Sequence, residues 1–291
     1  MNTLTFVDRF KITDGKTFRL TDVDPADHGP KRLKAQAPAL MAATLAALED
    51  AQERLYAQDE WALLLIFQAM DAAGKDGTIK HVMSGVNPAG VQVFSFKRPT
   101  PEELDHDFLW RTTRCLPEKG RIGIFNRSYY EETLVVRVHP EFLSAQRLPG
   151  PIDTPAFWQQ RFDDIAAFER HLSRNAMVIL KFFLHVSKAE QKRRFLARLD
   201  EPSKNWKFSA ADVRERERWD EYMHAYEETI RHTAATHAPW FVVPADKKWF
   251  THLVVGAAIV DALAELDLAF PKVDGARRKE LAAARRALEP E

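Results

Sequence analysis

The decisive stretch of the sequence is Trp61-Ala-Leu-Leu-Leu-Ile-Phe-Gln-Ala-Met-Asp71-Ala-Ala-Gly74-Lys75-Asp76-Gly77-Thr78-Ile-Lys80. It begins with a short apolar run, residues 61–67, which is typical of a strand buried inside a parallel sheet. A turn of small residues follows, and residues 78–84 are compatible with a helix. Small residues let the backbone approach a ligand, and the amides at the start of the next helix then face an anion. The stretch therefore predicts a strand, an anion-binding turn and a helix.

The turn matches the phosphate-loop pattern Gly-x-x-x-x-Gly-Lys-Ser/Thr only in part. Ala69 stands in place of the first glycine, and Asp76 stands in place of the serine or threonine. Lys75, directly after the last glycine, adds a positive charge for phosphate, although a structural turn with a solvated lysine is the alternative. We expect the rest of the loop and the first turns of the helix to bind phosphate, namely Ala72, Ala73, Gly74, Asp76, Gly77 and Lys80.

The composition describes a globular protein without net charge. The chain has 291 residues, 45% of them hydrophobic, and its 42 basic and 42 acidic side chains cancel. Because no overall field attracts nucleic acid or a membrane surface, any anion site has to be built locally. Cys115 is the only cysteine, which excludes an internal disulfide and fits a reducing compartment. No signal peptide or membrane-spanning run is recognisable, so we expect a cytoplasmic protein without a membrane partner.

The order of segments predicts an α/β fold. Residues 1–30 are polar and indicate an irregular leader, whereas apolar spacing in residues 31–58 indicates a long helix. Strands that alternate with helices require crossover connections, which produce a parallel sheet with helices on both faces. We expect one domain over residues 31–273 and a surface helix or tail over residues 274–291. The expected sheet has five parallel strands, at residues 61–67, 90–96, 121–125, 176–186 and 239–244.

A charged insertion, residues 187–237, separates the last two predicted strands. Seven basic and three acidic residues lie between Lys188 and Lys207, a local net charge of +4. Ser187-x-x-Glu190 at its start is typical of a helix cap. One interpretation is a solvated helix face, and the other is a helical lid that closes on phosphates. We favour the lid, because acidic residues just downstream leave the basic cluster as an isolated island.

Polar residues follow the carboxyl ends of several predicted strands, where ligands bind in open parallel sheets. Asp71 places a negative charge beside bound phosphates, which makes sense only if Mg²⁺ or a basic side chain screens it. Asp71 is therefore a candidate metal ligand or acceptor-positioning residue, and a turn aspartate that bonds its own backbone is the alternative. The other polar residues just past strand ends are Lys97, Asn126, Arg127 and Lys188.

The pair Asn126-Arg127 follows the third predicted strand, where a phosphate-loop protein carries a metal-binding acid. Asn126 is neutral and keeps only an acceptor oxygen, whereas Arg127 can hold phosphate through two parallel hydrogen bonds. Glu131 and Glu132 would repel phosphates unless one of them binds a metal or a nucleotide group. Acids on a helix surface are the alternative for both glutamates.

Three motifs in this order resemble the polyphosphate kinase 2 family over about residues 30–270. They are Asp71-Ala-Ala-Gly-Lys-Asp-Gly77, Phe125-Asn-Arg-Ser-Tyr-Tyr-Glu-Glu132, and Ser187-Lys188 with Gln191-Lys-Arg-Arg-Phe195 and Trp206-Lys207. The resemblance implies a thymidylate-kinase-like P-loop kinase, a three-layer sandwich with a helical lid. It also implies Mg²⁺-dependent transfer of phosphate between inorganic polyphosphate and nucleotides, with Mn²⁺ as the other candidate ion.

The resemblance also assigns roles to residues. Asp71 and Lys75 correspond to the Walker A pair, and Asn126 and Arg127 to the Walker B pair, although Asn126 replaces the family's commoner aspartate. Tyr130-Glu131-Glu132 resembles the class III pattern, whose members phosphorylate both AMP and ADP. Glu131 then faces the acceptor. The implied partners are polyphosphate and adenine or guanine nucleotides, and the implied assembly is a homo-oligomer, a dimer or tetramer. The residues implied to hold phosphates are Lys97, Arg111, Lys188 and Arg194.

Two other functions fit the same pattern. An ordinary nucleotide kinase with ATP as donor shares the fold but needs a donor-nucleoside pocket that the sequence does not reveal. A non-catalytic module that senses nucleotides or polyanions is supported by the neutral residue Asn126 and opposed by the many phosphate-binding candidates past the strand ends. Nucleic-acid binding is not favoured, because aromatic residues are not interleaved with the basic island.

Overall fold

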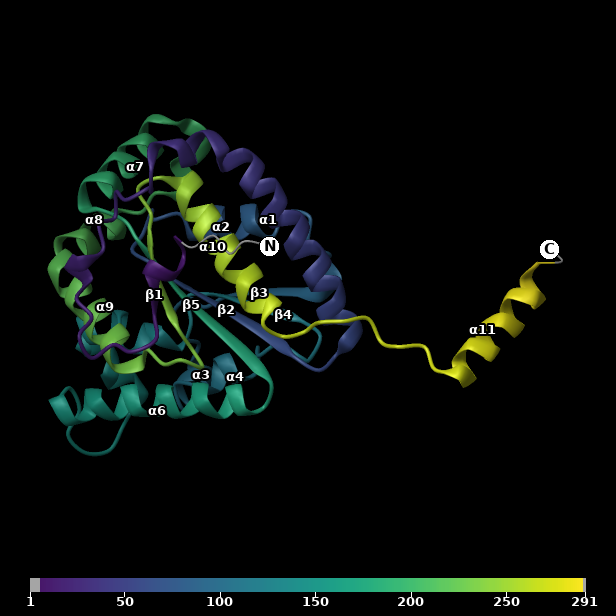
Figure 1. Cartoon of the computed structure of the whole chain (residues 1–291). Helices are drawn as coiled ribbons and strands as arrows, with labels where there is room; N and C mark the ends of the chain where they lie inside the picture. The colour runs from purple at the N-terminus through teal and green to yellow at the C-terminus, as the bar shows by residue number, and fades with distance from the viewer. Residues whose placement is uncertain (1–5, 290–291) are drawn as a thin grey trace.

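A six-stranded sheet runs through the middle of the computed structural model, which describes residues 6–289 (Figure 1). The strands lie in the order β1-β6-β5-β2-β4-β3. Every neighbouring pair among β2 to β6 is parallel, and β1 is antiparallel to β6. The strand bounds are β1 Lys11–Ile12, β2 Ala62–Gln68, β3 Val91–Ser95, β4 Ile122–Asn126, β5 Met177–His185 and β6 Trp240–Pro244.

The central strands are buried because their sequences offer no polar face. β2, Ala62–Gln68, lies between β5 and β4, and all seven of its residues are buried. A strand of this kind has to be covered on both faces of the sheet. The turn after β2 therefore leaves the sheet near the middle of its carboxyl edge, with a neighbouring strand on either side.

The prediction of a five-stranded, wholly parallel sheet is wrong, because the leader adds a sixth strand. Lys11 and Ile12 pair antiparallel with Phe241 and Trp240 on the outer side of β6. Two residues are too few to show a period in the sequence, so this strand could not be recognised there. The leader predicted to be irregular is thus tied to the sheet edge, and its Phe10 is buried.

Helices cover both faces of the sheet (Figure 1). On one face α10 (Lys248–Ala264) packs on β5 and β6 and against α1 (Lys31–Gln58) and α2 (Lys75–Val82). On the other face α6 (Pro155–Arg174) packs on β5 and against α9 (Trp219–Thr233). The bounds of α1 are those of the long helix predicted from apolar spacing.

The insertion predicted as a lid, residues 187–237, divides into two parts. α9 buries Tyr226 and Ile230 against the body, so it belongs to the helical layer and not to a lid. α7 (Lys188–Asp200) and α8 (Ala210–Glu217) precede it, and we restrict the proposed lid to residues 188–217. The short helices between β3 and α6 are α3 Pro101–Leu104, α4 Trp110–Thr113, α5 Val135–Val138, and the 3-10 helices η4 Tyr129–Glu132 and η5 Pro140–Gln146.

The last described helix, α11 (Gly275–Leu288), lies apart from the body at the end of an extended segment (Figure 1). None of its residues is buried, and it lies within residues 274–291, for which a surface helix or tail is predicted. Residues 1–5 of the predicted leader and 290–291 of the predicted tail lie outside the described residues. Within residues 6–289, no helix combines the length and the apolar character that a membrane crossing requires.

A buried ion pair joins the sheet to the helical layer formed by α6 and α9. Lys181 of β5 is fully buried, and its Nζ lies 2.6 Å from Oε2 of Glu169 in α6. The hydroxyls of Tyr129 and Tyr130 donate to Oε1 of the same glutamate, at 2.9 and 2.7 Å. Lys181 also donates to the Thr233 carbonyl of α9, at 2.8 Å. The charges are thus compensated by a connected network.

We expect Glu169→Leu to lower the free energy of unfolding by about 3–5 kcal/mol, because it leaves the Lys181 charge without its partner in the core. Urea unfolding followed by circular dichroism measures the change. Asp50→Leu is the control, because it removes an exposed i,i+4 pair with Arg54 and should cost less than about 1 kcal/mol. Equal losses in the two variants would contradict the interpretation.

A second stability effect depends on pH and arises at His185, the last residue of β5. The side chain is 8% exposed, and burial lowers the pKa of His185 to about 4. The unfolded chain takes up this proton near pH 6.5, so it binds more protons than the folded protein between pH 6.5 and 4. The free energy of unfolding should therefore fall by about 3 kcal/mol as pH decreases through this window.

His185→Phe tests the effect, because it keeps a ring beside Phe183 and removes the titrating group. Its unfolding free energy, measured in urea at several pH values, should depend less on pH than that of the wild type. His171→Phe, at an exposed position of α6, should leave the slope unchanged. A His185→Phe protein with the wild-type slope would show that His185 does not cause the effect.

Candidate active site

The loop between β2 and α2 contains two residues in the left-handed region of backbone conformation. Ala72 has a φ of 62°, and Gly74 has a φ of 111°. The second value strains any residue with a Cβ, which explains the glycine at this position. α2 begins at Lys75, three residues before the predicted start, because the Thr78 amide already closes a turn on the Gly74 carbonyl (2.9 Å). The loop thus leads directly into a helix N-terminus, a geometry that binds anions.

The side chain of Lys75 folds back across the loop. Its Nζ donates to the Ala69 carbonyl at 2.9 Å. Burial lowers the pKa of Lys75 and the neighbouring Arg127 lowers it further, whereas Asp71 and Glu131 act in the opposite direction. An oxyanion bound at Nζ would favour the charged form of Lys75, so the site is arranged to gain from a bound anion.

Arg127 reaches the loop from the neighbouring strand. β2 and β4 pair with Phe67 opposite Asn126, and the Arg127 amide donates to the Phe67 carbonyl at 3.0 Å. Arg127 Nη2 lies 3.3 Å from Asp71 Oδ1. The pKa of Arg127 is raised, chiefly by the Glu131 carboxylate and then by Asp71. The guanidinium therefore pairs with Asp71 and lies within the electrostatic influence of Glu131, with its side chain 41% exposed.

Two amide side chains at the strand ends orient two of the acids. Asn126 Nδ2 donates to Asp76 Oδ1 at 2.6 Å, and Gln68 Nε2 donates to Glu131 Oε1 at 2.8 Å. The prediction missed Gln68, although a polar residue at the carboxyl end of an apolar strand was an available signal. The hydrogen bond from Gln68 keeps the Glu131 carboxylate near Arg127. Gln68 therefore helps to position a residue of the site.

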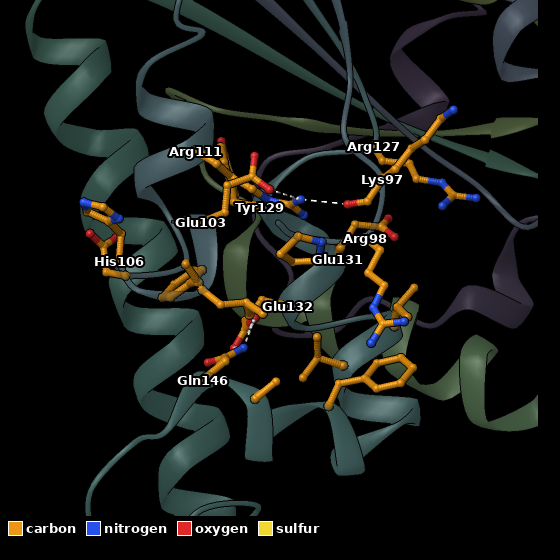
Figure 2. A pocket seen from close by; sticks show the side chains of 18 of the residues that line it. Lys97, Arg98, Glu103, His106, Arg111, Arg127, Tyr129, Glu131, Glu132 and Gln146 are labelled. Carbon is orange, nitrogen blue, oxygen red and sulfur yellow. Dashed lines mark hydrogen bonds and ion pairs between the residues drawn. The ribbon is translucent and has the colours of Figure 1, made fainter. Parts of the chain in front are cut away.

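A cavity of about 430 Å³ opens beside Arg127 (Figure 2). Figure 2 shows Arg127, Lys97 and Arg98 on one side of it and His106 on the opposite side. Arg111 lines the cavity as well, and its Nη1 donates to the Lys97 carbonyl at 2.7 Å, which fixes the chain after β3. The apolar lining residues include Leu104, Phe108, Val135, Val136 and Phe142.

The two adjacent acids on the cavity wall have different surroundings. Glu132 is 6% exposed and accepts hydrogen bonds from Arg161 Nε at 3.1 Å and from Gln146 Nε2 at 2.9 Å. Burial raises the pKa of Glu132, and Arg161 opposes this shift. Glu131 lies beside Arg127 and is held by Gln68. Glu132 therefore belongs to the supporting structure, and Glu131 belongs to the site.

The two lid residues predicted to hold phosphate also differ. Lys188 is exposed, with its Nζ 5.9 Å from the centre of the Trp219 ring. Arg194 is only 7% exposed, and its guanidinium donates to the carbonyls of Ala72 (3.0 Å), Ala73 (2.6 Å) and Ala245 (2.6 Å). Arg194 thus binds the backbone of the loop, and the phosphate contact predicted for it stays a prediction.

The helix α2 and the lid contribute further residues around the loop. Gly77 and Lys80 are exposed on α2, and a Cβ added at Gly77 would meet nothing within 4 Å. Asp212 of α8 lies near enough for Asp71 to raise its pKa, after the larger effect of burial, while Arg127 lowers it. Nothing in the sequence indicated Asp212, because its position depends on how the lid folds.

The acids around the loop fit a metal ion that takes few protein ligands. Among residues 6–289, no three His, Cys, Asp or Glu side chains cluster as a closed cation site. Mg²⁺ in phosphoryl-transfer sites is usually bound by one or two carboxylates together with phosphate oxygens. Asp71 in the loop and Asp76 in the first turn of α2 supply such a donor set, and the Asn126 amide orients Asp76.

Two features meet at one edge of the sheet: a loop with Lys75 that opens a helix, and a cavity lined on one side by Lys97, Arg98 and Arg127. They define a mixed α/β protein with a strand–loop–helix turn beside a cavity. The chain belongs to the polyphosphate kinase 2 family, because the family described as "Polyphosphate kinase 2 (PPK2)" matches residues 32–271. The family resemblance predicted from the three motifs is thereby confirmed.

Similar proteins agree with this assignment. The chain is 51% identical over 282 residues to the ADP-polyphosphate phosphotransferase of Rhodopseudomonas palustris, covering 94% of this chain and 95% of that protein. It is 42% identical over 275 residues to the AMP/ADP-polyphosphate phosphotransferase of Meiothermus ruber, covering 93% and 98%. The crystal structure of polyphosphate kinase 2 from Arthrobacter aurescens TC1 matches with a TM-score of 0.85 and 42% identity, covering 94% and 95%. The protein is accordingly an enzyme that transfers phosphate groups.

Proposed function

We propose that this protein is a P-loop kinase that transfers phosphate from inorganic polyphosphate to AMP and ADP, and that it also runs in the reverse direction. The proposal rests on Arg127, which pairs with Asp71 of the loop and at the same time lines the cavity. A guanidinium in this place contacts both a phosphate chain held by the loop and a nucleotide phosphate at the basic end of the cavity. The reacting groups of donor and acceptor then meet at one cation.

The residues divide the work of phosphoryl transfer, which depends mainly on positioning and on electrostatic stabilisation. Lys75 and the loop amides hold the donor phosphates, and Arg127 stabilises charge on the transferring group. Asp71 fixes the position of the guanidinium, and the Glu131 carboxylate favours its charge. Mg²⁺, or Mn²⁺ in its place, would be held by Asp71 and Asp76 and would neutralise charge on the phosphate oxygens.

The cavity suits a nucleotide acceptor. Its volume of about 430 Å³ lies within the range typical of small-molecule sites. Lys97, Arg98 and Arg127 can bind phosphates at one end, while apolar side chains such as Phe108 and Phe142 can enclose a base. One relative is named for ADP and another for AMP and ADP, which supports these two nucleotides as acceptors.

The direct test is to mix the purified protein with AMP, polyphosphate and Mg²⁺ and to follow ADP and ATP by chromatography, with ADP as acceptor in a parallel reaction. We expect product from both acceptors. Turnover of ADP alone would restrict the proposal to nucleoside diphosphates. Turnover with ATP as donor to AMP, and none with polyphosphate, would favour an ordinary nucleotide kinase, and binding without any turnover would favour a sensor.

A further inference from the structure

The first two turns of α7 hold three consecutive carbonyl groups of the loop. Gln191 Nε2 donates to the Asp71 carbonyl at 3.0 Å, and Arg194 Nη1 donates to the carbonyls of Ala72 and Ala73. Gln191 and Arg194 lie one helical turn apart and are 1% and 7% exposed. Buried donors that meet backbone acceptors in series form a built contact and not a chance surface interaction.

This contact determines where the loop amides point. In a trans peptide the C=O and the following N–H point in opposite directions. With the carbonyls of residues 71–73 turned toward α7, the amides that follow them are turned away from it. The Ala73 amide is occupied by the Met70 carbonyl (3.2 Å). The amides of Ala72 and Gly74 are thus aimed away from α7, as a concave anion site requires.

The start of α7 is itself anchored to the body. The carboxylate of Asp246 accepts from the Ser187 amide and from the Ser187 hydroxyl, both at 2.8 Å. Arg194 Nη2 donates to the Ala245 carbonyl at 2.6 Å, so the same guanidinium joins the loop to the segment after β6. The loop carbonyls are therefore held by a part of α7 that is fixed to the body, and a closing movement of the proposed lid would involve the residues after Arg194.

Gln191 also connects the loop to the second lid helix. Its Oε1 accepts from Arg216 Nη1 of α8 at 2.9 Å, while its Nε2 donates to the Asp71 carbonyl. Arg216 Nη1 additionally donates to the Lys188 carbonyl at 2.6 Å. One neutral amide thus links α8 to the loop residue whose carboxylate holds Arg127.

We propose that Gln191 and Arg194 are positioning residues that hold the loop in the conformation that accepts phosphate. They set the affinity for the polyphosphate donor without contacting it. The inference rests on the proposed function in one respect, namely that polyphosphate occupies the loop. It gives Arg194 a role in place of the phosphate contact expected from its charge, and it assigns a function to the uncharged Gln191.

Gln191→Met is the decisive variant, because it keeps the size of the side chain and removes no charge. The variant loses the bond to the Asp71 carbonyl and the bond from Arg216. We expect the loss of the first to raise the KM for polyphosphate about tenfold, while the KM for AMP stays within about twofold. In the protein without substrate, the backbone amides of residues 70–76 should exchange with deuterium faster than in the wild type. A residue with a general structural role would not separate the two KM values.

Arg193→Met is the matched control. Arg193 is next to Arg194, carries the same charge and pairs with the same Glu190 at 2.6 Å, but its side chain is 68% exposed. It should leave both KM values within about twofold of the wild type. A rise in the polyphosphate KM as large as that of Gln191→Met would mean that lid charge and not loop geometry sets affinity, and it would overturn the proposal.

Other outcomes are equally decisive. An unchanged polyphosphate KM and wild-type exchange at residues 70–76 in Gln191→Met would overturn the inference. If that variant does not fold, Arg194→Lys keeps the charge but has a single nitrogen, so it cannot bind the loop carbonyls through one nitrogen and the Ala245 carbonyl through another, and the same selective rise is expected. If the wild type shows no polyphosphate-dependent turnover, the proposed function fails. The inference is then still tested by titrating tripolyphosphate into the wild type and into Gln191→Met and comparing the deuterium exchange of the amides of residues 70–76.

Discussion

Arg127→Met should reduce kcat for polyphosphate-dependent phosphorylation of AMP by about 10³-fold, the lower end of what an arginine on the transferring phosphate contributes. The reason is the shared position of the guanidinium, 3.3 Å from Asp71 in the loop and on the wall of the cavity. Arg127→Lys should recover only a small part of the loss, because an ammonium group cannot make two parallel bonds to phosphate. Initial rates at saturating substrates, with product measured by chromatography, give the comparison.

Arg121→Met provides the matched control for this prediction. Arg121 directly precedes β4, the strand that Arg127 follows, and it pairs with Glu118 at 2.9 Å outside the cavity lining. Its removal takes away the same charge and should leave kcat within about twofold. If Arg127→Met kept more than a tenth of the wild-type kcat, the meeting of donor and acceptor at this guanidinium would be disproved.

The elements that could be predicted are those whose pattern repeats within one segment. The uninterrupted apolar run of β2 could only be a strand covered on both faces, and the apolar spacing of residues 31–58 gave the bounds of α1. β1 could not be predicted, because a two-residue strand exists only through its pairing with β6. The position of α9 in the body was missed as well, since charged residues obscure its buried face of Tyr226 and Ile230.

In the site, too, features encoded within one segment could be predicted, and contacts between distant segments could not. Asp71 and Arg127 were expected at one edge of the sheet because carboxyl ends of parallel strands converge there, and they lie 3.3 Å apart. The carbonyl contacts of Arg194 could not be predicted, because charge alone does not tell whether an arginine meets a phosphate or a carbonyl, and the phosphate contact stays a prediction. Its acceptors, Ala72, Ala73 and Ala245, come from two distant segments, and only the fold brings them together.

Lys75→Met should lower kcat by about 10²–10³-fold, the loss typical of removing one preorganised donor from a developing negative charge. Nζ of Lys75 lies at the loop, 2.9 Å from the Ala69 carbonyl, where a bound phosphate can replace that acceptor. The same substitution should not destabilise the protein. Burial and the nearby Arg127 already lower the pKa of Lys75, so the charge is unfavourable in the folded protein without an anion.

This combination separates catalysis from folding. Urea unfolding of Lys75→Met should give a free energy equal to or above that of the wild type, while the AMP assay shows the loss of turnover. Lys119→Met, at an exposed position before β4, should change neither quantity. A Lys75→Met protein that binds polyphosphate and turns over like the wild type would show that the loop lysine is a solvated turn residue. A fall in the free energy of unfolding that is large enough to account for the loss of turnover would show that Lys75 has a structural role.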